Sequence, residues 1–156
     1  MQINQELEMN VPESFRVLNE EERAQMNFLV DGEGVCLRSE EKHMLISIGW
    51  KKVNAFSALI LSTKDIAGDM EKRFRKALKD YDYDLEGFLE RNIGERKAEG
   101  LRYTYQSQEK DMVSESFALK RGETFYYFHV YLRQEEREER LPIWEEFLTT
   151  AVWKAE

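Results

Sequence analysis

Cysteine, histidine and proline are scarce in this sequence, and each shortage excludes a class of protein. The single cysteine, Cys36, permits no disulfide within the chain, which is typical of a reducing compartment. The two histidines, His43 and His129, are too few for a Cys/His zinc site within one chain. Two prolines, eight glycines and no low-complexity linker favour a single domain over residues 1–156, with its core between about residues 6 and 153.

Long apolar runs and basic clusters are also missing. No stretch of about 18 uncharged apolar residues occurs, so we expect no membrane span. The first residues have neither the basic start nor the apolar block of a signal peptide, which predicts a cytoplasmic protein. The net charge is −8 and the isoelectric point about 5.0, and such a field repels phosphate groups. We therefore expect no nucleic-acid partner and no membrane partner.

Motifs for nucleotide binding and zinc hydrolysis are absent, because no P-loop, G-x-G-x-x-G or H-E-x-x-H occurs. Asp80, Asp82 and Asp84 match the first three ligand positions of an EF-hand calcium loop. However, Leu85 occupies the position of the essential glycine, and Arg91 occupies that of the final glutamate. We expect a helix end that runs into a solvated loop here, and no metal or other cofactor.

The most apolar and most aromatic run of the chain is residues 123–133. Read at the period of two of a β-strand, both of its alternating faces are largely apolar. This pattern predicts a central strand that is covered on both sides. One face carries Tyr126, Phe128, Val130 and Leu132, and the other carries Phe125, Tyr127, His129 and Tyr131.

Shorter alternating runs predict further strands around this one. The first two runs form a hairpin pattern, and the last two lead into the central strand as a meander, which favours antiparallel neighbours. Residues 95–100 read as a polar loop, and residues 6–10 as a short strand. The runs are 34–38, 43–53, 101–106 and 112–120. Residues 85–93 are expected to be extended, although the spacing of Leu85 and Leu89 also fits a helix.

Helical patterns predict layers on this sheet. Residues 62–81 carry an apolar stripe behind a serine or threonine cap, and residues 19–28 begin with an asparagine cap, before a turn at 31–32. A proline suits the first turn of a final helix over 142–152, and the charged segment before it is either helical or a solvated loop. Together these patterns predict an α+β fold, with an antiparallel sheet of about five to seven strands flanked by helices.

His129 is the one residue of the central strand with possible chemistry. Ser114, Ser116 and Glu115 on the neighbouring strand could supply a nucleophile and an orienting acid. No G-x-S-x-G motif marks either serine, so we favour a hydrogen-bonded core histidine, and a small hydrolase-like enzyme is the weakest alternative. For Cys36 we likewise favour a buried or half-buried structural role over a catalytic thiol.

One stretch places aromatic residues next to cations where a strand ends, namely Trp50, Lys51, Lys52 and Phe56. Aromatic and basic side chains often anchor protein interfaces, so these four residues are a candidate protein-contact surface. The alternative is that Trp50 completes the apolar face of its own strand, and we favour this alternative.

The order of elements matches a known pattern, which is a Pro-x-x-Phe start, strands, a long helix, a meander and a Trp-x-x-Phe helix at the end. The matching positions are Pro12, Phe15, the strand 125–132, Trp144, Phe147 and Leu148. This order resembles the fold shared by the photosystem subunit PsbP, the Mog-type Ran-binding import factors and the bacterial DcrB-like proteins. The resemblance implies an α/β/α sandwich and an adaptor or assembly role, and it brings no manganese, calcium or Ran-contact residue with it.

These observations lead to a ranked expectation of function. The first hypothesis is a non-catalytic, cytoplasmic protein-binding or adaptor domain, motivated by a full core without convergent catalytic residues. The alternative, which fits the size, the charge and the order of elements, is a dimeric acidic chaperone of the type that guards secreted effectors. We expect a protein partner in either case, and the sequence leaves the oligomeric state open.

Overall fold

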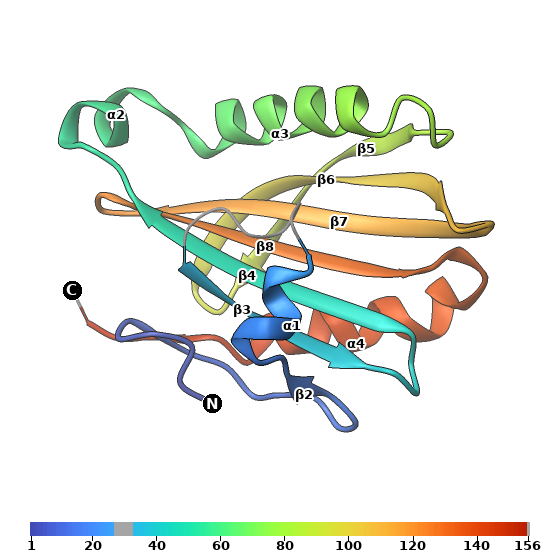
Figure 1. Cartoon of the computed structure of the whole chain (residues 1–156). Helices are drawn as coiled ribbons and strands as arrows, with labels where there is room; N and C mark the ends of the chain where they lie inside the picture. The colour runs from blue at the N-terminus through green and yellow to red at the C-terminus, as the bar shows by residue number, and fades with distance from the viewer. Residues whose placement is uncertain (27–32, 156) are drawn as a thin grey trace.

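The computed structural model describes residues 1–26 and 33–155, and within them the chain forms a seven-stranded antiparallel sheet (Figure 1). The strands are β2 (Arg16–Val17), β3 (Glu33–Ser39), β4 (Met44–Lys52), β5 (Asp84–Ile93), β6 (Arg96–Ser107), β7 (Lys110–Arg121) and β8 (Thr124–Arg133). Their order across the sheet is β2-β3-β4-β8-β7-β6-β5. The strand predicted to be central is therefore the fourth of seven.

Helices lie on both faces of this sheet. α3 (Thr63–Ala77) packs on one face over β6 and β7, and α4 (Arg137–Thr149) packs on the other against β5 and β8. On the α4 side, β1 (Leu7–Glu8) and β9 (Val152–Trp153) form a small second sheet. Two further helices, α1 (Glu20–Ala24) and α2 (Ala55–Ile60), are short. The predicted α+β sandwich is confirmed. In the described part of the chain, no helix is long and apolar enough to cross a membrane.

β8 divides its side chains between two cores. On the α4 side its four alternating residues are fully buried in the larger core. On the α3 side Phe125 joins Ile66, Ala67 and Met70 of α3 in a smaller core. Because a fully buried large apolar side chain contributes about 1.5–3 kcal/mol, burial on both faces explains the central position of β8. The four residues on the α4 side are Tyr126, Phe128, Val130 and Leu132.

The predicted polar loop over 95–100 is wrong. β6 begins at Arg96, directly after a two-residue turn. The inward positions at the start of this strand hold Ala98 and Gly100, and both are buried. Small inward residues do not produce the apolar alternation by which a strand is recognised, so the sequence pattern missed residues 96–100 of β6.

The predicted final helix over 142–152 is wrong at both ends. α4 begins at Arg137, directly after a 3₁₀ turn, η1 (Gln134–Glu136), and it ends at Thr149. Two glutamates lie in its first turn, where carboxylates interact favourably with the helix dipole. The charged segment before Pro142 is therefore helical, and the proline lies inside the helix.

The predicted starts of the other two helices are confirmed. Ser62 caps α3 and Asn19 caps α1, and each side chain accepts a hydrogen bond from the backbone N–H three residues on. α3 ends at Ala77, short of the predicted end at residue 81. The predicted end of the first helix near residue 28 and the predicted turn at 31–32 lie outside the described residues.

Candidate functional site

α2 stands at one end of the sheet, after β4 and before α3 (Figure 1). Asn54 caps its N-terminus, where the Oδ1 atom accepts a hydrogen bond from the Ser57 N–H at 2.7 Å. At its C-terminus the carbonyls of Ala58 and Leu61 accept hydrogen bonds from Lys120 Nζ at 2.6 and 3.1 Å. These polar contacts hold a helix that is too short to be stable by itself.

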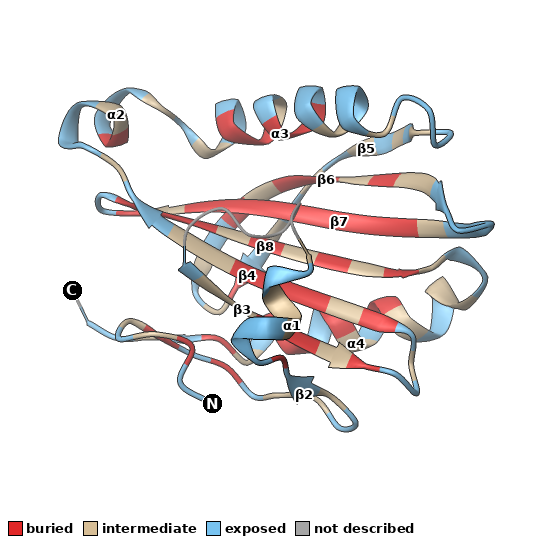
Figure 2. Ribbon diagram, in the orientation of Figure 1, coloured by how far each residue is buried: buried red, intermediate tan, exposed pale blue. Residues whose placement is uncertain are grey.

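Three large apolar side chains of α2 face solvent. Phe56 is 70% exposed, Leu59 81% and Ile60 57%, whereas Ala58 is buried against the rest of the molecule. Figure 2 shows α2 as largely exposed, with one buried patch. Contiguous exposed apolar residues of this kind mark interaction sites more often than single exposed ones do. We call Phe56, Leu59 and Ile60 the α2 apolar cluster.

Three lysines lie on the elements next to this cluster. Residues 43–64 contain no Asp or Glu, although the chain has 31 of them. Lys51 on β4 and Lys120 on β7 both lie opposite Phe125 of β8, so all three side chains share the α3 face of the sheet. Lys64 is exposed in the first turn of α3. We call Lys51, Lys64 and Lys120 the lysine rim.

The four predicted contact residues do not share one surface. Trp50 packs against the α4-side core, and its Nε1 donates a hydrogen bond to Glu33 Oε2 at 2.9 Å, so it completes the apolar face of its strand. Lys51 points to the opposite face, and Lys52 lines a shallow hollow near the β7–β8 turn. Phe56 belongs to the α2 apolar cluster. A contact role for the four residues stays a prediction.

Sequence reasoning missed Leu59 and Ile60. The stretch from residue 54 to 61 is apolar without a clear period, so it read as neither helix nor strand. A signal was nevertheless present, because an asparagine that can cap a helix precedes apolar residues within the acid-free run 43–64.

Comparisons with known proteins agree with this architecture. No family model matches the sequence, and no curated protein matches it. Among solved structures, PsbP of the cyanobacterium Synechocystis (CyanoP) is similar with a TM-score of 0.67 and 11% identity, over 95% of this chain and 86% of that one. The fold is PsbP-like.

Two other solved structures show the same fold at low identity. PA94 of Pseudomonas aeruginosa, a protein of unknown function, has a TM-score of 0.56 and 14% identity, over 94% of this chain and 87% of that one. LpqN of Mycobacterium tuberculosis, described as involved in cell envelope biogenesis, has a TM-score of 0.54 and 12% identity, over 96% and 83% of the two chains. Likenesses at such identities show the PsbP-like fold and carry no function.

Within the PsbP-like sheet, His129 meets one of its predicted partners but not the others. Its Nδ1 lies 2.7 Å from Ser116 Oγ. Glu115 lies on the opposite face of β7, where it accepts hydrogen bonds from two arginines and a tryptophan. A histidine–serine pair is present, but the predicted acid cannot orient the imidazole.

Burial and the nearby charge of Arg73 lower the pKa of His129 to about 4. His129 is therefore protonated near pH 6.5 in the unfolded chain but only near pH 4 in the folded chain. We predict that proton uptake by His129 lowers the free energy of unfolding by about 3 kcal/mol between these pH values, and that His129→Gln, which does not titrate, removes this contribution. Urea unfolding at half-unit pH steps measures it, and equal slopes in both proteins would contradict the prediction.

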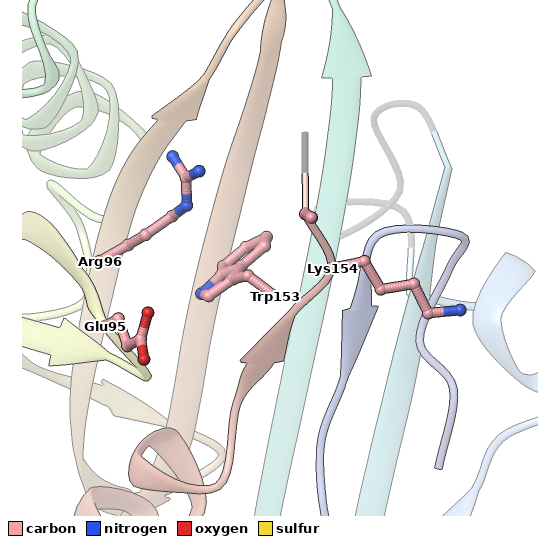
Figure 3. A pocket seen from close by; sticks show the side chains of 5 residues that line it. Glu95, Arg96, Trp153 and Lys154 are labelled. Carbon is pink, nitrogen blue, oxygen red and sulfur yellow. The ribbon is translucent and has the colours of Figure 1, made fainter.

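A shallow hollow of about 260 Å³ lies beside Trp153 (Figure 3). Glu95, Arg96, Lys154 and Ala155 complete its lining, and the Arg96 guanidinium carbon lies 5.7 Å from the centre of the Trp153 ring. Figure 3 shows the Lys154 side chain pointing away from Glu95 and Arg96. The carboxylate and the guanidinium offset each other, so this hollow favours neither anions nor cations.

The remaining candidate residues lie apart. Asp80 and Asp82 lie in the turn after α3, and Asp84 begins β5. Cys36 is buried on β3 as a free thiol, and His43 Nδ1 lies at the surface, 3.0 Å from Glu136 Oε1. Across residues 1–26 and 33–155, no three His, Cys, Asp or Glu side chains gather closely enough to hold a metal ion.

Proposed function

We propose that the protein is a non-catalytic, cytoplasmic protein-binding domain, and that the α2 apolar cluster docks its partner. The observation that carries the proposal is that Phe56, Leu59 and Ile60 are each more than half exposed on one six-residue helix. Each such side chain contributes about 1.5–3 kcal/mol when it is fully buried, so a partner that covers all three gains the energy of an interface hot spot. The buried free thiol of Cys36 supports a reducing compartment.

A catalytic function has less support. Ser116 could give its proton to a neutral His129, but a general base of this kind is normally oriented by a third group. The charge that lies close to the imidazole is that of Arg73, which is the wrong sign for stabilising an imidazolium.

Cross-linking in cells tests the docking role. With a photo-activatable amino acid at position 60, we predict one main cross-linked adduct. The double variant Phe56→Ser, Leu59→Ser should reduce the amount of this adduct at least about tenfold, because truncating a hot-spot residue costs about 2 kcal/mol of binding free energy. Quantitative immunoblots measure the adduct, and thermal melts verify that the variants fold. Phe88→Ser is the matched control, because Phe88 is 59% exposed on β5, away from α2. An adduct that survives the double variant, or that Phe88→Ser reduces equally, would count against docking through α2.

A dimeric chaperone remains the second candidate, because an exposed apolar helix is also a surface that a second copy could cover. The chain has a mass of 18.6 kDa, so static light scattering separates the two candidates directly. A monomer mass at tens of micromolar excludes the chaperone, whereas a dimer that Leu59→Ser dissociates would favour it over an adaptor.

A further inference from the structure

We infer that the partner surface recognised by α2 is apolar at its centre and acidic at its edge, such as an amphipathic helix with a stripe of leucines flanked by Asp and Glu. This inference rests on the proposed function and specifies the chemistry of the partner. The observation behind it is the lysine rim around the α2 apolar cluster.

The rim is a local reversal of charge. The chain carries −8 overall, yet the elements next to the α2 apolar cluster carry Lys51, Lys64 and Lys120. Along the chain, the acids nearest to Lys64 and Lys120 are Asp65 in the first turn of α3 and Glu123 in the β7–β8 turn. Three cations against two acids, in a protein with an excess of acids, leave this end of the sheet positive relative to the remaining surface.

Lys120 has two functions in this arrangement. Its ammonium group binds the C-terminal carbonyls of α2, so it fixes the helix and at the same time holds a positive charge beside the apolar cluster. Lys51 lies across β8 from it, with Nζ 6.0 Å from the centre of the Tyr127 ring. An acidic partner would thus meet the Lys120 charge that is held at the end of α2, together with the exposed Lys51 and Lys64.

A second copy of this chain is a poorer occupant. A two-fold dimer through α2 presents the same patch from both subunits, so the lysine rims would face each other. Like charges across an interface oppose association, whereas an acidic rim on a different protein complements them.

An anionic membrane is also a poorer occupant. The excess of negative charge on the remaining surface repels anionic headgroups. A six-residue helix offers only three side chains for insertion, far fewer than a typical interfacial helix. A protein partner needs no such length, because a small apolar centre inside a charged rim is the usual anatomy of a protein interface.

Two synthetic peptides test the inference. Both form the same amphipathic helix with one stripe of leucines, and they differ only in whether glutamates or lysines flank the stripe. Fluorescence anisotropy at low salt should show the glutamate peptide binding roughly tenfold more tightly than the lysine peptide. The preference should shrink at about 0.5 M salt, where charges are screened within a few ångströms.

Variants locate the effect. The double variant Lys51→Glu, Lys64→Glu should abolish the preference for the glutamate peptide. The control is Lys79→Glu, Lys110→Glu, which changes the charge equally at exposed positions away from α2 and should leave the preference intact. Leu59→Ser should weaken the binding of both peptides. If Leu59→Ser weakens the binding of both peptides but the wild type prefers neither, the inferred acidic partner is wrong and docking through α2 stands. If Leu59→Ser has no effect, the proposed function itself fails.

Vesicles complete the experiment. The wild-type protein should not sediment with vesicles of phosphatidylcholine that contain one third phosphatidylglycerol. Sedimentation that Lys51→Glu with Lys64→Glu abolishes, together with no peptide preference, would assign the rim to a membrane surface and overturn the inference.

Discussion

Glu115→Leu will lower the free energy of unfolding by about 3 kcal/mol, because the substitution leaves two arginines without their buried counter-charge. Glu115 is fully buried on β7. It accepts hydrogen bonds from Arg91 at 2.8 and 2.9 Å and from Arg102 at 2.8 and 2.7 Å. The indole N–H of Trp144 adds a further bond at 3.0 Å. Leucine has a similar volume and fills the space, so the loss measures charge and hydrogen bonding, not a cavity.

Urea unfolding at pH 7 measures this loss. The matched control is Glu90→Gln, which removes an exposed carboxylate whose partner is Lys97 at 3.0 Å. Exposed ion pairs contribute little, so we expect a change below about 0.5 kcal/mol for the control. A Glu115→Leu protein within 1 kcal/mol of the wild type would mean that water replaces the lost carboxylate for both arginines.

Acidification should expose the same interaction. Burial raises the pKa of Glu115, but the hydrogen bonds and charges of Arg91 and Arg102 outweigh burial and hold the pKa below its ordinary value. The stabilisation is therefore complete above the pKa of the unfolded chain and is lost as the pH falls through the lower pKa of the folded chain. The loss from Glu115 therefore begins only below the ordinary carboxyl pKa, whereas the contribution of His129 already falls from pH 6.5 downward.

The sheet is predictable from sequence because the period of two is a local property. The run 123–133 shows two apolar faces, and β8 has a core on each side. The network around Glu115 is not predictable in this way. Its members come from β5, β6, β7 and α4, and only the strand register brings Arg102 opposite Glu115. Register depends on the packing of the whole sheet, which spacing along the chain does not reveal.

The candidate site was only partly predictable for a related reason. Phe56 stood out because an aromatic residue follows a pair of lysines. α2 spans fewer than two helical turns, too few for a helical period to be recognised, so Leu59 and Ile60 gave no pattern. Whether an apolar residue is buried or exposed depends on which element packs over it. That is a property of the fold and not of the residue.

Gly100 is the position where the sheet has no room for a side chain. It lies opposite Phe117 in the β6–β7 pair, and a Cβ atom built on it would meet Phe117 Cδ1 at 2.7 Å and would overlap the carbonyl oxygen of Ser116. The Phe117 ring, fully buried, thus covers a glycine across the strand. This pairing compensates for the missing side chain of a strand glycine.

We therefore predict that Gly100→Ala lowers the free energy of unfolding by about 3 kcal/mol, because overpacking forces either the β7 backbone or the Phe117 ring to move. Gly87→Ala on β5 is the matched control, since an added Cβ there meets nothing within 4 Å, and we expect it to change stability by less than about 1 kcal/mol. Thermal and urea unfolding of both variants provide the comparison. A Gly100→Ala protein as stable as Gly87→Ala would contradict the prediction and show that β6 and β7 can separate locally. The sheet would then be far more deformable at the Gly100–Phe117 pair than the close packing of its core implies.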